Sequence, residues 1–296
     1  MPKDKAQQSA RQPFPKGEGV LVTGSSSGIG HEVAEYLAER GFTVFASVRK
    51  EQDAERLRSL GQPNLVPVCP LDLTRLDHIP PVVEAITQEL DHRGQNGLYA
   101  IVNNAGGGSQ APIELLDLAK FRSELEARIL GPVALLQSFL PLIRAAHGRI
   151  LWIATPALLP IPYVASIHAC DFAVNCMART LELELMPWRI PSISIRCGGI
   201  DTAAPGKTAR ELEAALQAWP RERLDLYARA LQKEQEELSA FDRGRTNPRE
   251  VAKVVFAALS ARKPKRRYYI GHMAALAAFL ELFPQPVVDW IMAKRA

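Results

Sequence analysis

A short apolar run passes directly into a glycine-rich loop in the stretch Gly19-Val20-Leu21-Val22-Thr23-Gly24-Ser25-Ser26-Ser27-Gly28-Ile29-Gly30. The apolar run predicts a buried parallel strand, and the spacing of apolar residues over 31–40 predicts a helix after the loop. Glycines allow a tight turn and a close approach of the backbone, and the N-terminus of a helix offers free N–H groups to an anion. The stretch therefore predicts a strand–loop–helix unit that cradles a phosphate group.

Strands and helices alternate along the rest of the chain. Apolar runs predict further strands at 42–48, 65–68, 98–102, 149–153, 192–196 and 268–271. Helical segments are predicted at 76–92, 114–145, 167–186 and 248–261. This alternation predicts an α/β fold with a doubly wound parallel sheet (a Rossmann fold), in which ligands bind beyond the carboxyl ends of the strands. The 296 residues, 47% of them hydrophobic, suffice for one well-buried core.

We expect a single domain over 18–272. Three segments depart from its alternating pattern of strands and helices. Residues 1–17 are polar and lack the apolar core of a signal peptide, so we expect a disordered leader. Residues 204–245 are charged and helical, and we expect them to cover the substrate site as a lid. The apolar residues 273–296 predict a helical tail. A docked helical pair is favoured there over a channel wall, a dimer face or a membrane-surface foot.

Charge and cysteine usage narrow the class of protein. The net charge is +4, and the densest basic run, 262–267, has no interleaved aromatic residues, so a solvated loop is favoured over a nucleic-acid site. The four cysteines have neither Cys-x-x-Cys nor zinc spacing, so we expect no metal site and a reducing, cytoplasmic location. The uncharged stretch 151–170 is interrupted by Pro156, Pro160 and Pro162, which argues against a membrane span.

Further motifs resemble the classical short-chain dehydrogenase/reductase family over residues 18–270. The family's Thr-Gly-x-x-x-Gly-x-Gly loop is matched by 23–30, its Asn-Asn-Ala-Gly turn by 103–106, and its Pro-Gly-x-x-x-Thr segment by 197–202, with Cys197 replacing the proline. The Arg-Arg-Tyr-Tyr-Ile-Gly run before the tail is similar to steroid- and retinol-type members. The resemblance implies a dinucleotide cofactor and a homo-oligomer, a dimer or a tetramer. It assigns the following residues to the cofactor: Thr23, Gly24, Ser26, Ser27, Gly28, Ile29, Gly30, Asp72, Leu73, Asn104, Ala105, Gly106, Ile200 and Thr202.

The residues after the second predicted strand indicate which dinucleotide is bound. An acidic side chain there would bind the ribose 2′-hydroxyl of NAD and repel a 2′-phosphate. This chain has Val48 followed by Arg49 and Lys50. A guanidinium suits a phosphate, so we predict NADP(H), with Arg49 as a cofactor-binding residue; a solvated role for Arg49 is the alternative. His31, just after the loop, is a further candidate for a phosphate contact.

The family's catalytic positions are altered in this chain. The run Tyr163-Val164-Ala165-Ser166-Ile167 looks like the family's Tyr-x-Ala-Ser-Lys, but the family's spacing to the 197–202 segment is kept by Ile167 and not by Tyr163. Ile167 therefore takes the tyrosine position, and Asp171 takes the lysine position. The serine position falls on Ala154, with Thr155 one residue later, and the asparagine position falls on Arg128.

These replacements remove the usual proton machinery. In the family, tyrosine gives a proton to the carbonyl oxygen, lysine lowers the pKa of that tyrosine, and serine stabilises the oxyanion. Isoleucine can do none of this. We predict that Arg128 and Asp171 form an ion pair, or that Asp171 accepts hydroxyls of the ribose; independent drift of the two positions is the alternative. The candidate catalytic residues are Asp171, Arg128, Thr155 and His168, with Tyr163 as a further possible acid. Trp152 either narrows the site or packs in the core.

Three functions fit this pattern. The first is an NADPH-dependent reductase of a hydrophobic carbonyl, imine or iminium substrate that works by a non-standard mechanism. The second is a non-redox cyclase or isomerase that uses Arg128 and Asp171 as acid and base. The third is a catalytically inactive NADP(H)-binding sensor or partner subunit. We expect a hydrophobic small-molecule substrate, and association of copies through the apolar stretches 133–143 and 172–185.

Overall fold

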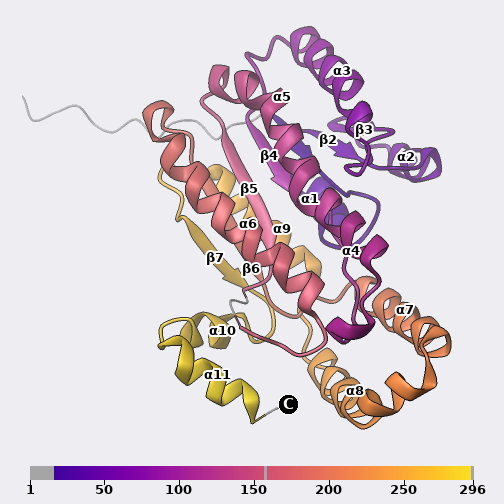
Figure 1. Cartoon of the computed structure of the whole chain (residues 1–296). Coiled ribbons are helices and arrows are strands. Elements are labelled where there is room, and N and C mark those ends of the chain that lie inside the picture. The colour runs from indigo at the N-terminus through magenta and orange to yellow at the C-terminus, as the bar shows by residue number, and fades with distance from the viewer. Residues whose placement is uncertain (1–16, 157–158, 295–296) are drawn as a thin grey trace, which may run out of the picture.

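The computed structural model describes residues 17–156 and 159–294, so the predicted leader lies almost wholly outside the described residues. Seven strands form a parallel sheet in the order β3-β2-β1-β4-β5-β6-β7, which confirms the predicted doubly wound fold (Figure 1). The strands are β1 Gly19–Val22, β2 Thr43–Ser47, β3 Leu65–Val68, β4 Ala100–Asn103, β5 Arg149–Ala154, β6 Ser192–Cys197 and β7 Arg267–Ile270.

Helices cover both faces of the sheet. The helices are α1 Gly28–Glu39, α2 Glu51–Arg58, α3 Ile79–His92, α4 Leu118–Leu125, α5 Gly131–Ala145, α6 Ala165–Glu184, α7 Ala204–Ala218, α8 Arg221–Asp242, α9 Pro248–Ser260, α10 Ala274–Leu280 and α11 Gln285–Ala293. Alternate strand residues point to opposite faces, so Val20 and Val22 pack under α1 and α9, whereas Leu21 packs under α3 and α5. Because both of their faces are buried, β1, β2 and β4 are nearly continuous apolar runs, whereas the edge strand β7 is exposed or half-buried.

The strand order places the candidate site. After β3 the chain crosses to the other side of β1 and continues as β4, so the order of the sheet reverses between β1 and β4. The loops that follow β1 and β4 therefore diverge at the carboxyl edge and leave a crevice there. The glycine loop follows β1, and the turn 103–106 follows β4.

Several helices differ in detail from the sequence prediction. Helix α2 was not predicted, because only Ala54 and Leu57 in it are buried and so short a segment shows no helical period. The segment predicted as one helix over 114–145 contains a π-helical turn, Glu126–Leu130, between α4 and α5. The predicted lid consists of two helices, α7 and α8, and Pro220 begins the second.

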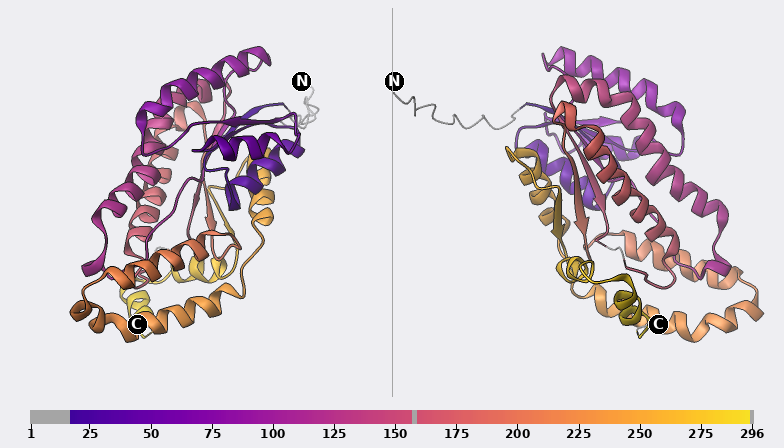
Figure 2. Two further views of the ribbon diagram at one scale, coloured as in Figure 1. Left: turned by 90° about the vertical axis from the view of Figure 1, so that its right-hand side faces the viewer. Right: turned by 60° about the vertical axis from the view of Figure 1, so that its left-hand side comes forward.

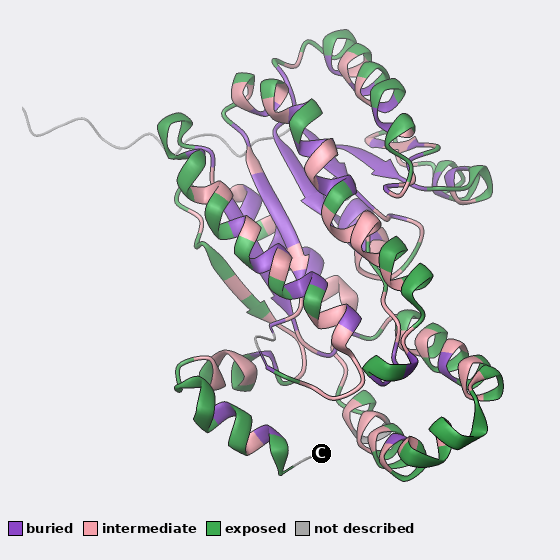
Figure 3. Cartoon of the chain, viewed as in Figure 1, coloured by how far each residue is buried: buried purple, intermediate pink, exposed green. Residues whose placement is uncertain are grey.

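The lid helices and the tail both lie beyond the carboxyl ends of the strands (Figure 2). The tail forms a helical pair, α10 and α11, as predicted. Most of its residues are exposed or half-buried, in contrast to the inner strands of the sheet (Figure 3). The exposed large apolar side chains of the tail are Met273, Leu276, Phe279, Leu282, Phe283, Val287 and Trp290.

One continuous helical stretch, Leu118–Ala145, is long and apolar enough by composition to cross a membrane. Core helices pass the same test, and Leu135, Phe139 and Ile143 of this stretch are buried in the core. The prolines in 151–170 argued against a membrane span there. In this stretch β5 ends at Ala154 and α6 begins at Ala165.

Candidate active site

The glycine loop is closed by contacts that tolerate no side chain. Gly24 has a φ of 69°, and a Cβ on it would lie 2.9 Å from the Cα of Ala105. Gly28 has a φ of 59°, and a Cβ on it would lie 3.2 Å from the methyl group of Thr202. A side chain on Gly30 would overlap the carbonyl oxygen of Gly24. The loop is therefore in contact with two of the other segments assigned to the cofactor, those of Ala105 and Thr202.

Hydrogen bonds lock the glycine loop to the turn after β4. The Thr23 hydroxyl oxygen accepts the N–H groups of Asn104 at 2.9 Å and Ala105 at 3.0 Å. In return, the Asn104 side-chain amide donates to the carbonyl oxygen of Thr23 at 3.0 Å. These hydrogen bonds join the loop after β1 to the turn after β4. They therefore fix the shape of the crevice before any ligand binds.

The N-terminus of α1 is open to an anion. Ser27 takes the N-cap position in an extended conformation, and neither it nor an acidic residue of the first turn occupies the free N–H groups. Free N–H groups and the positive end of the helix dipole favour a phosphate there. The Nδ1 atom of His31 is buried and has no hydrogen-bond partner among the described residues, which suits the predicted phosphate contact of His31.

A cation other than the predicted one touches the loop. Arg49 lies exposed just after β2. Arg56 of α2 donates to the carbonyl oxygen of Ser26 at 2.5 Å and forms an ion pair with Asp53 at 3.0 Å. The sequence prediction missed Arg56 because α2 itself was missed.

The acidic residue after β3 shapes its own turn. The Asp72 carboxylate accepts the backbone N–H of Thr74 at 3.0 Å and the hydroxyl of Thr74 at 2.9 Å. Leu73 beside it is buried, and a side chain on Gly131 would overlap the Leu73 carbonyl oxygen. This turn is therefore fixed against the first turn of α5.

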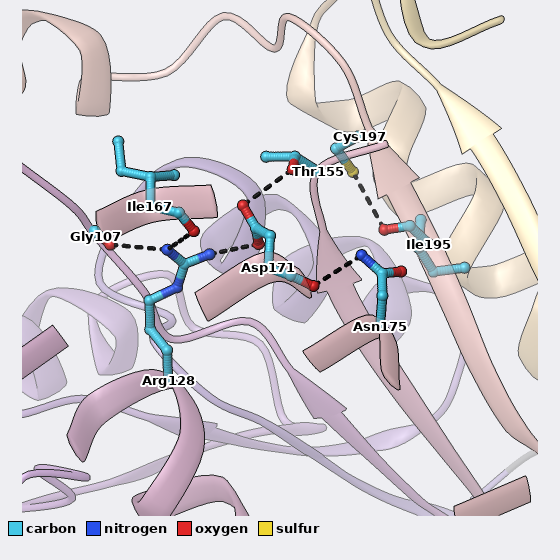
Figure 4. A network of polar contacts seen from close by, with 8 residues as sticks. All are labelled: Gly107, Arg128, Thr155, Ile167, Asp171, Asn175, Ile195 and Cys197. Carbon is cyan, nitrogen blue, oxygen red and sulfur yellow. Dashed lines mark hydrogen bonds and ion pairs between the residues drawn. The ribbon is translucent and has the colours of Figure 1, made fainter. Parts of the chain in front are cut away.

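The predicted ion pair between Arg128 and Asp171 is present (Figure 4). The Arg128 guanidinium donates to one Asp171 oxygen at 2.5 Å, and the Thr155 hydroxyl donates to the other at 3.0 Å. The side chain of Asp171 is only 1% exposed, and that of Arg128 is 11% exposed. Both carboxylate oxygens are thus satisfied, which a buried charge requires.

Arg128 is directed into the site by the π-helical turn. A π turn adds one residue to the helical repeat and changes the direction of the side chains, and such turns are frequent at functional sites. The guanidinium also donates to the carbonyl oxygens of Gly107 at 3.3 Å and Ile167 at 3.2 Å. Its Nε atom faces Gly106, because a Cβ on Gly106 would lie 3.5 Å from it. The cation therefore covers the turn whose residues are assigned to the cofactor.

Ile167 and Tyr163 occupy different surroundings. A side chain on Gly108 would overlap Cγ1 of Ile167, so Ile167 packs directly on the turn after β4. Tyr163 precedes α6 with a left-handed φ of 64°, and its ring packs edge-on against Tyr227 of α8, with 6.4 Å between ring centroids. Ile167, and not Tyr163, lies beside the Arg128–Asp171 pair, through the hydrogen bond of its carbonyl oxygen to Arg128.

His168, Trp152 and Cys197, which lie near the cluster in sequence or in the fold, make packing or anchoring contacts. The Nδ1 atom of His168 lies 2.9 Å from the Leu159 carbonyl oxygen, and burial lowers the pKa of His168, which favours the neutral ring. Trp152 is buried and donates from Nε1 to the Ser192 hydroxyl at 3.1 Å, so it packs in the core. Burial raises the pKa of Cys197 to about 12, so this thiol stays neutral.

A buried arginine that the sequence prediction did not include extends the polar network. Arg196 of β6 is 1% exposed and donates to the Asn175 side-chain oxygen at 3.0 Å. It also donates to both carboxylate oxygens of Glu281, at 2.7 and 2.6 Å. Asn175 in turn donates to the backbone carbonyl oxygen of Asp171 at 2.9 Å. The signal in the sequence was an arginine near the end of an apolar strand.

One hollow lies near this cluster, and another lies apart from it. A small cavity of about 30 Å³ lies between the turn after Gly108 and α7, lined in part by Gln110, Leu212 and Trp219. A wider groove of about 400 Å³ lies along α6, β6 and β7, lined in part by Arg179 and Arg267. The small cavity lies where the lid meets the site, and the groove contains none of the predicted site residues.

A model of short chain dehydrogenases matches residues 18–213. The chain belongs to the short-chain dehydrogenase family. It is similar to estradiol 17-beta-dehydrogenase 2 of Mus musculus, at 29% identity over 291 residues, covering 93% of this chain and 74% of that protein. It is also similar to human 11-beta-hydroxysteroid dehydrogenase type 2, at 31% identity over 273 residues, covering 89% of this chain and 66% of that protein. These matches confirm the resemblance to steroid-type members of the family.

Solved structures of short-chain dehydrogenases share the fold. A short-chain dehydrogenase from Burkholderia cenocepacia in complex with NADP has a TM-score of 0.70 and 25% identity, and the match covers 94% of this chain and 98% of that one. L-Sorbose reductase from Gluconobacter frateurii, with NADPH and L-sorbose, has a TM-score of 0.69 and 26% identity, covering 86% of this chain and 95% of that one. The chain is therefore a single-domain short-chain dehydrogenase with a nicotinamide cofactor site.

Proposed function

We propose that this short-chain dehydrogenase binds NADP(H) and reduces a hydrophobic carbonyl or iminium compound without a tyrosine acid. The observation that carries the proposal is the Arg128–Asp171–Thr155 cluster, which lies beside the turn that closes the glycine loop. A complete cofactor cradle is thus combined with a charged cluster that contains no tyrosine.

The residues present fit the cofactor. Gly24, Gly28 and Gly30 let the loop turn tightly against its neighbours, and the uncapped N-terminus of α1 offers free N–H groups to the pyrophosphate. Arg49 and Arg56 supply cations near the end of β2, where the 2′-phosphate of NADP(H) would lie. Two structures of similar fold hold NADP or NADPH, which supports the choice of NADP(H) over NAD(H).

The cluster has little to offer as a proton donor. When bound, the reduced nicotinamide supplies the hydride. Both Asp171 oxygens accept hydrogen bonds, and the Thr155 hydroxyl directs its hydrogen to Asp171. Arg128 is a permanent cation, and its Nε atom faces Gly106. It therefore stabilises negative charge on a carbonyl oxygen without giving up a proton. A carbonyl substrate then takes its proton from water, whereas an iminium substrate needs none.

The steroid dehydrogenases among the relatives support an apolar ring compound as the substrate. Ile167 on the turn after β4 and Trp219 beside the small cavity offer apolar surface on the two sides of the crevice. The predicted homo-oligomer and cytoplasmic location stay predictions.

A non-redox cyclase or isomerase is the second candidate, and the buried Arg128–Asp171 pair is the observation that favours it. An acid–base pair of this kind would turn over a substrate with oxidised cofactor or none. A requirement for reduced cofactor separates the two candidates, and cofactor binding without any turnover would indicate the predicted sensor or partner subunit.

The proposal is tested by incubating the protein with NADPH and a panel of steroid ketones, other apolar ketones and cyclic imines, and by following the loss of NADPH fluorescence. We expect at least one class to be reduced. Asp171→Asn leaves Arg128 without its counter-ion, and we expect it to lower kcat/KM by about tenfold or more. Asp289→Asn on the exposed face of α11 is the matched control. The reductase proposal fails if no compound oxidises NADPH.

A further inference from the structure

A buried ion pair joins the tail to β6, the strand next to the edge strand β7 of the sheet. Arg196 lies in β6, where its neighbours in the strand are buried, and Glu281 directly follows α10. Their side chains are 1% and 9% exposed, and the guanidinium contacts both carboxylate oxygens. A buried arginine is tolerated only when it is paired and hydrogen-bonded, so the fold requires Glu281 at this place.

Arg196 is also connected to the candidate active site through Asn175. Its Nε donates to the Asn175 side chain, and the Asn175 amide donates to the backbone carbonyl oxygen of Asp171. Asn175 is buried and stands one turn after Asp171 on α6. The polar contacts are therefore continuous from the tail to the residue that pairs with Arg128.

A second, apolar contact leads from the tail to the same part of α6. Val288 and Met292 of α11 form a small buried cluster with Leu159, which lies in the segment between β5 and α6. The carbonyl oxygen of Leu159 lies 2.9 Å from the His168 ring nitrogen in the first turn of α6. Both contacts end on the two turns that carry Ile167 and Asp171.

We propose that Arg196 and Glu281 are positioning residues, through which α10 and α11 hold the first turns of α6 and keep Asp171 against Arg128 and Thr155. The tail is then a working part of the active site, although it does not supply a group of the Arg128–Asp171–Thr155 cluster. This role is independent of whether the cluster serves a reductase or a non-redox enzyme.

The test is hydrogen–deuterium exchange, followed by mass spectrometry, on the full chain and on Glu281→Gln. Three peptides are compared: the tail 273–294, the start of α6 at 164–176, and α5 at 131–145. We expect Glu281→Gln to speed exchange by about tenfold or more in both the tail and the start of α6, because local opening of the tail frees α6. Exchange in α5, which is outside this path, should stay unchanged.

Asp289→Asn, an equivalent loss of charge at an exposed position of α11, should leave all three peptides unchanged. Faster exchange in the tail alone would overturn the proposal, because no effect would then reach α6. An equal increase in α5 would also overturn it, because the loss would then be global. If Glu281→Gln does not fold, Glu281→Asp keeps the charge, shortens the side chain and is judged by the same three peptides.

Discussion

At the scale of single residues, Arg56 is the cation best placed to select the cofactor. It is held over the glycine loop by the Ser26 carbonyl oxygen and by Asp53. We expect Arg56→Gln to weaken NADP⁺ relative to NAD⁺ by about tenfold, since a charge-assisted contact to the 2′-phosphate is lost. Calorimetric titration with both nucleotides measures this ratio.

Two further variants make the measurement specific to Arg56. Arg58→Gln removes a neighbouring arginine of α2 that pairs with Glu51 at 2.6 Å, and it should leave the ratio unchanged. Arg49→Gln tests the residue that the sequence predicted. An equal loss of affinity for NADP⁺ and NAD⁺ in Arg56→Gln would show that this arginine only shapes the loop.

Gly108 is the residue that makes room for Ile167. Because a Cβ there would overlap Cγ1 of Ile167, Gly108→Ala should lower the free energy of unfolding by about 1–3 kcal/mol. Gly107→Ala is the matched control, since nothing lies within 4 Å of its Cβ position. Urea denaturation of both variants, and of Gly108→Ala combined with Ile167→Ala, checks the cause. The second substitution should recover most of the loss, and no recovery would contradict the stated contact.

At the scale of elements, the start of α6 depends on a neutral histidine. Burial lowers the pKa of His168 below its ordinary 6.5, and the Leu159 carbonyl and Asp171 oppose this only in part. The unfolded chain therefore binds a proton at a higher pH than the folded protein does. Stability from this residue is present above about pH 6.5 and is lost as the pH falls toward the folded pKa.

His168→Asn keeps an N–H donor for Leu159 but does not titrate. Wild type should lose stability relative to this variant by at most about 1.4 kcal/mol per pH unit below about pH 6.5. Urea unfolding of both proteins over a pH series measures the difference. Parallel stability curves for the two proteins would contradict the predicted dependence on His168.

The elements also show which features the sequence could predict. Apolar runs indicated the strands, most clearly β1, β2 and β4, because a strand that is buried on both faces shows no alternation of apolar and polar residues. The Arg128–Asp171 pair could be predicted because both positions follow from the spacing of family motifs. The π turn that directs Arg128 could not, since it reflects packing between α4, α6 and the turn after β4 rather than a local preference.

The features missed from the sequence depend on contacts between distant parts of the chain. Arg56 was missed because α2 buries only two residues and shows no clear period. Arg196 and Glu281 are 85 residues apart, and nothing in either neighbourhood predicts the pairing. In the sequence alone, Arg196 is a charge near the end of an apolar strand, and the tail is an apolar segment that predicts a docked helical pair but not its ion pair with β6.

At the scale of the whole molecule, the tail is as much a part of the core as of the surface. Removing residues 273–296 would delete Glu281 and leave Arg196 without its carboxylate partner, and it would uncover Leu159. We expect the free energy of unfolding to fall by about 3–5 kcal/mol from the lost charge partner alone. Urea denaturation of the truncated and full chains measures this loss.

The same loss can be assigned to the charge by removing the arginine as well. In the truncated chain, Arg196→Met replaces a cation that has lost its carboxylate partner with an apolar side chain of similar length, so it should recover part of the lost stability. In the full chain, Arg196→Met strips Glu281 of its partner and should destabilise. If the pair joins the sheet to the tail, Arg196→Met should change the free energy of unfolding in opposite directions in the two chains. The same sign in both would contradict the predicted role of the pair.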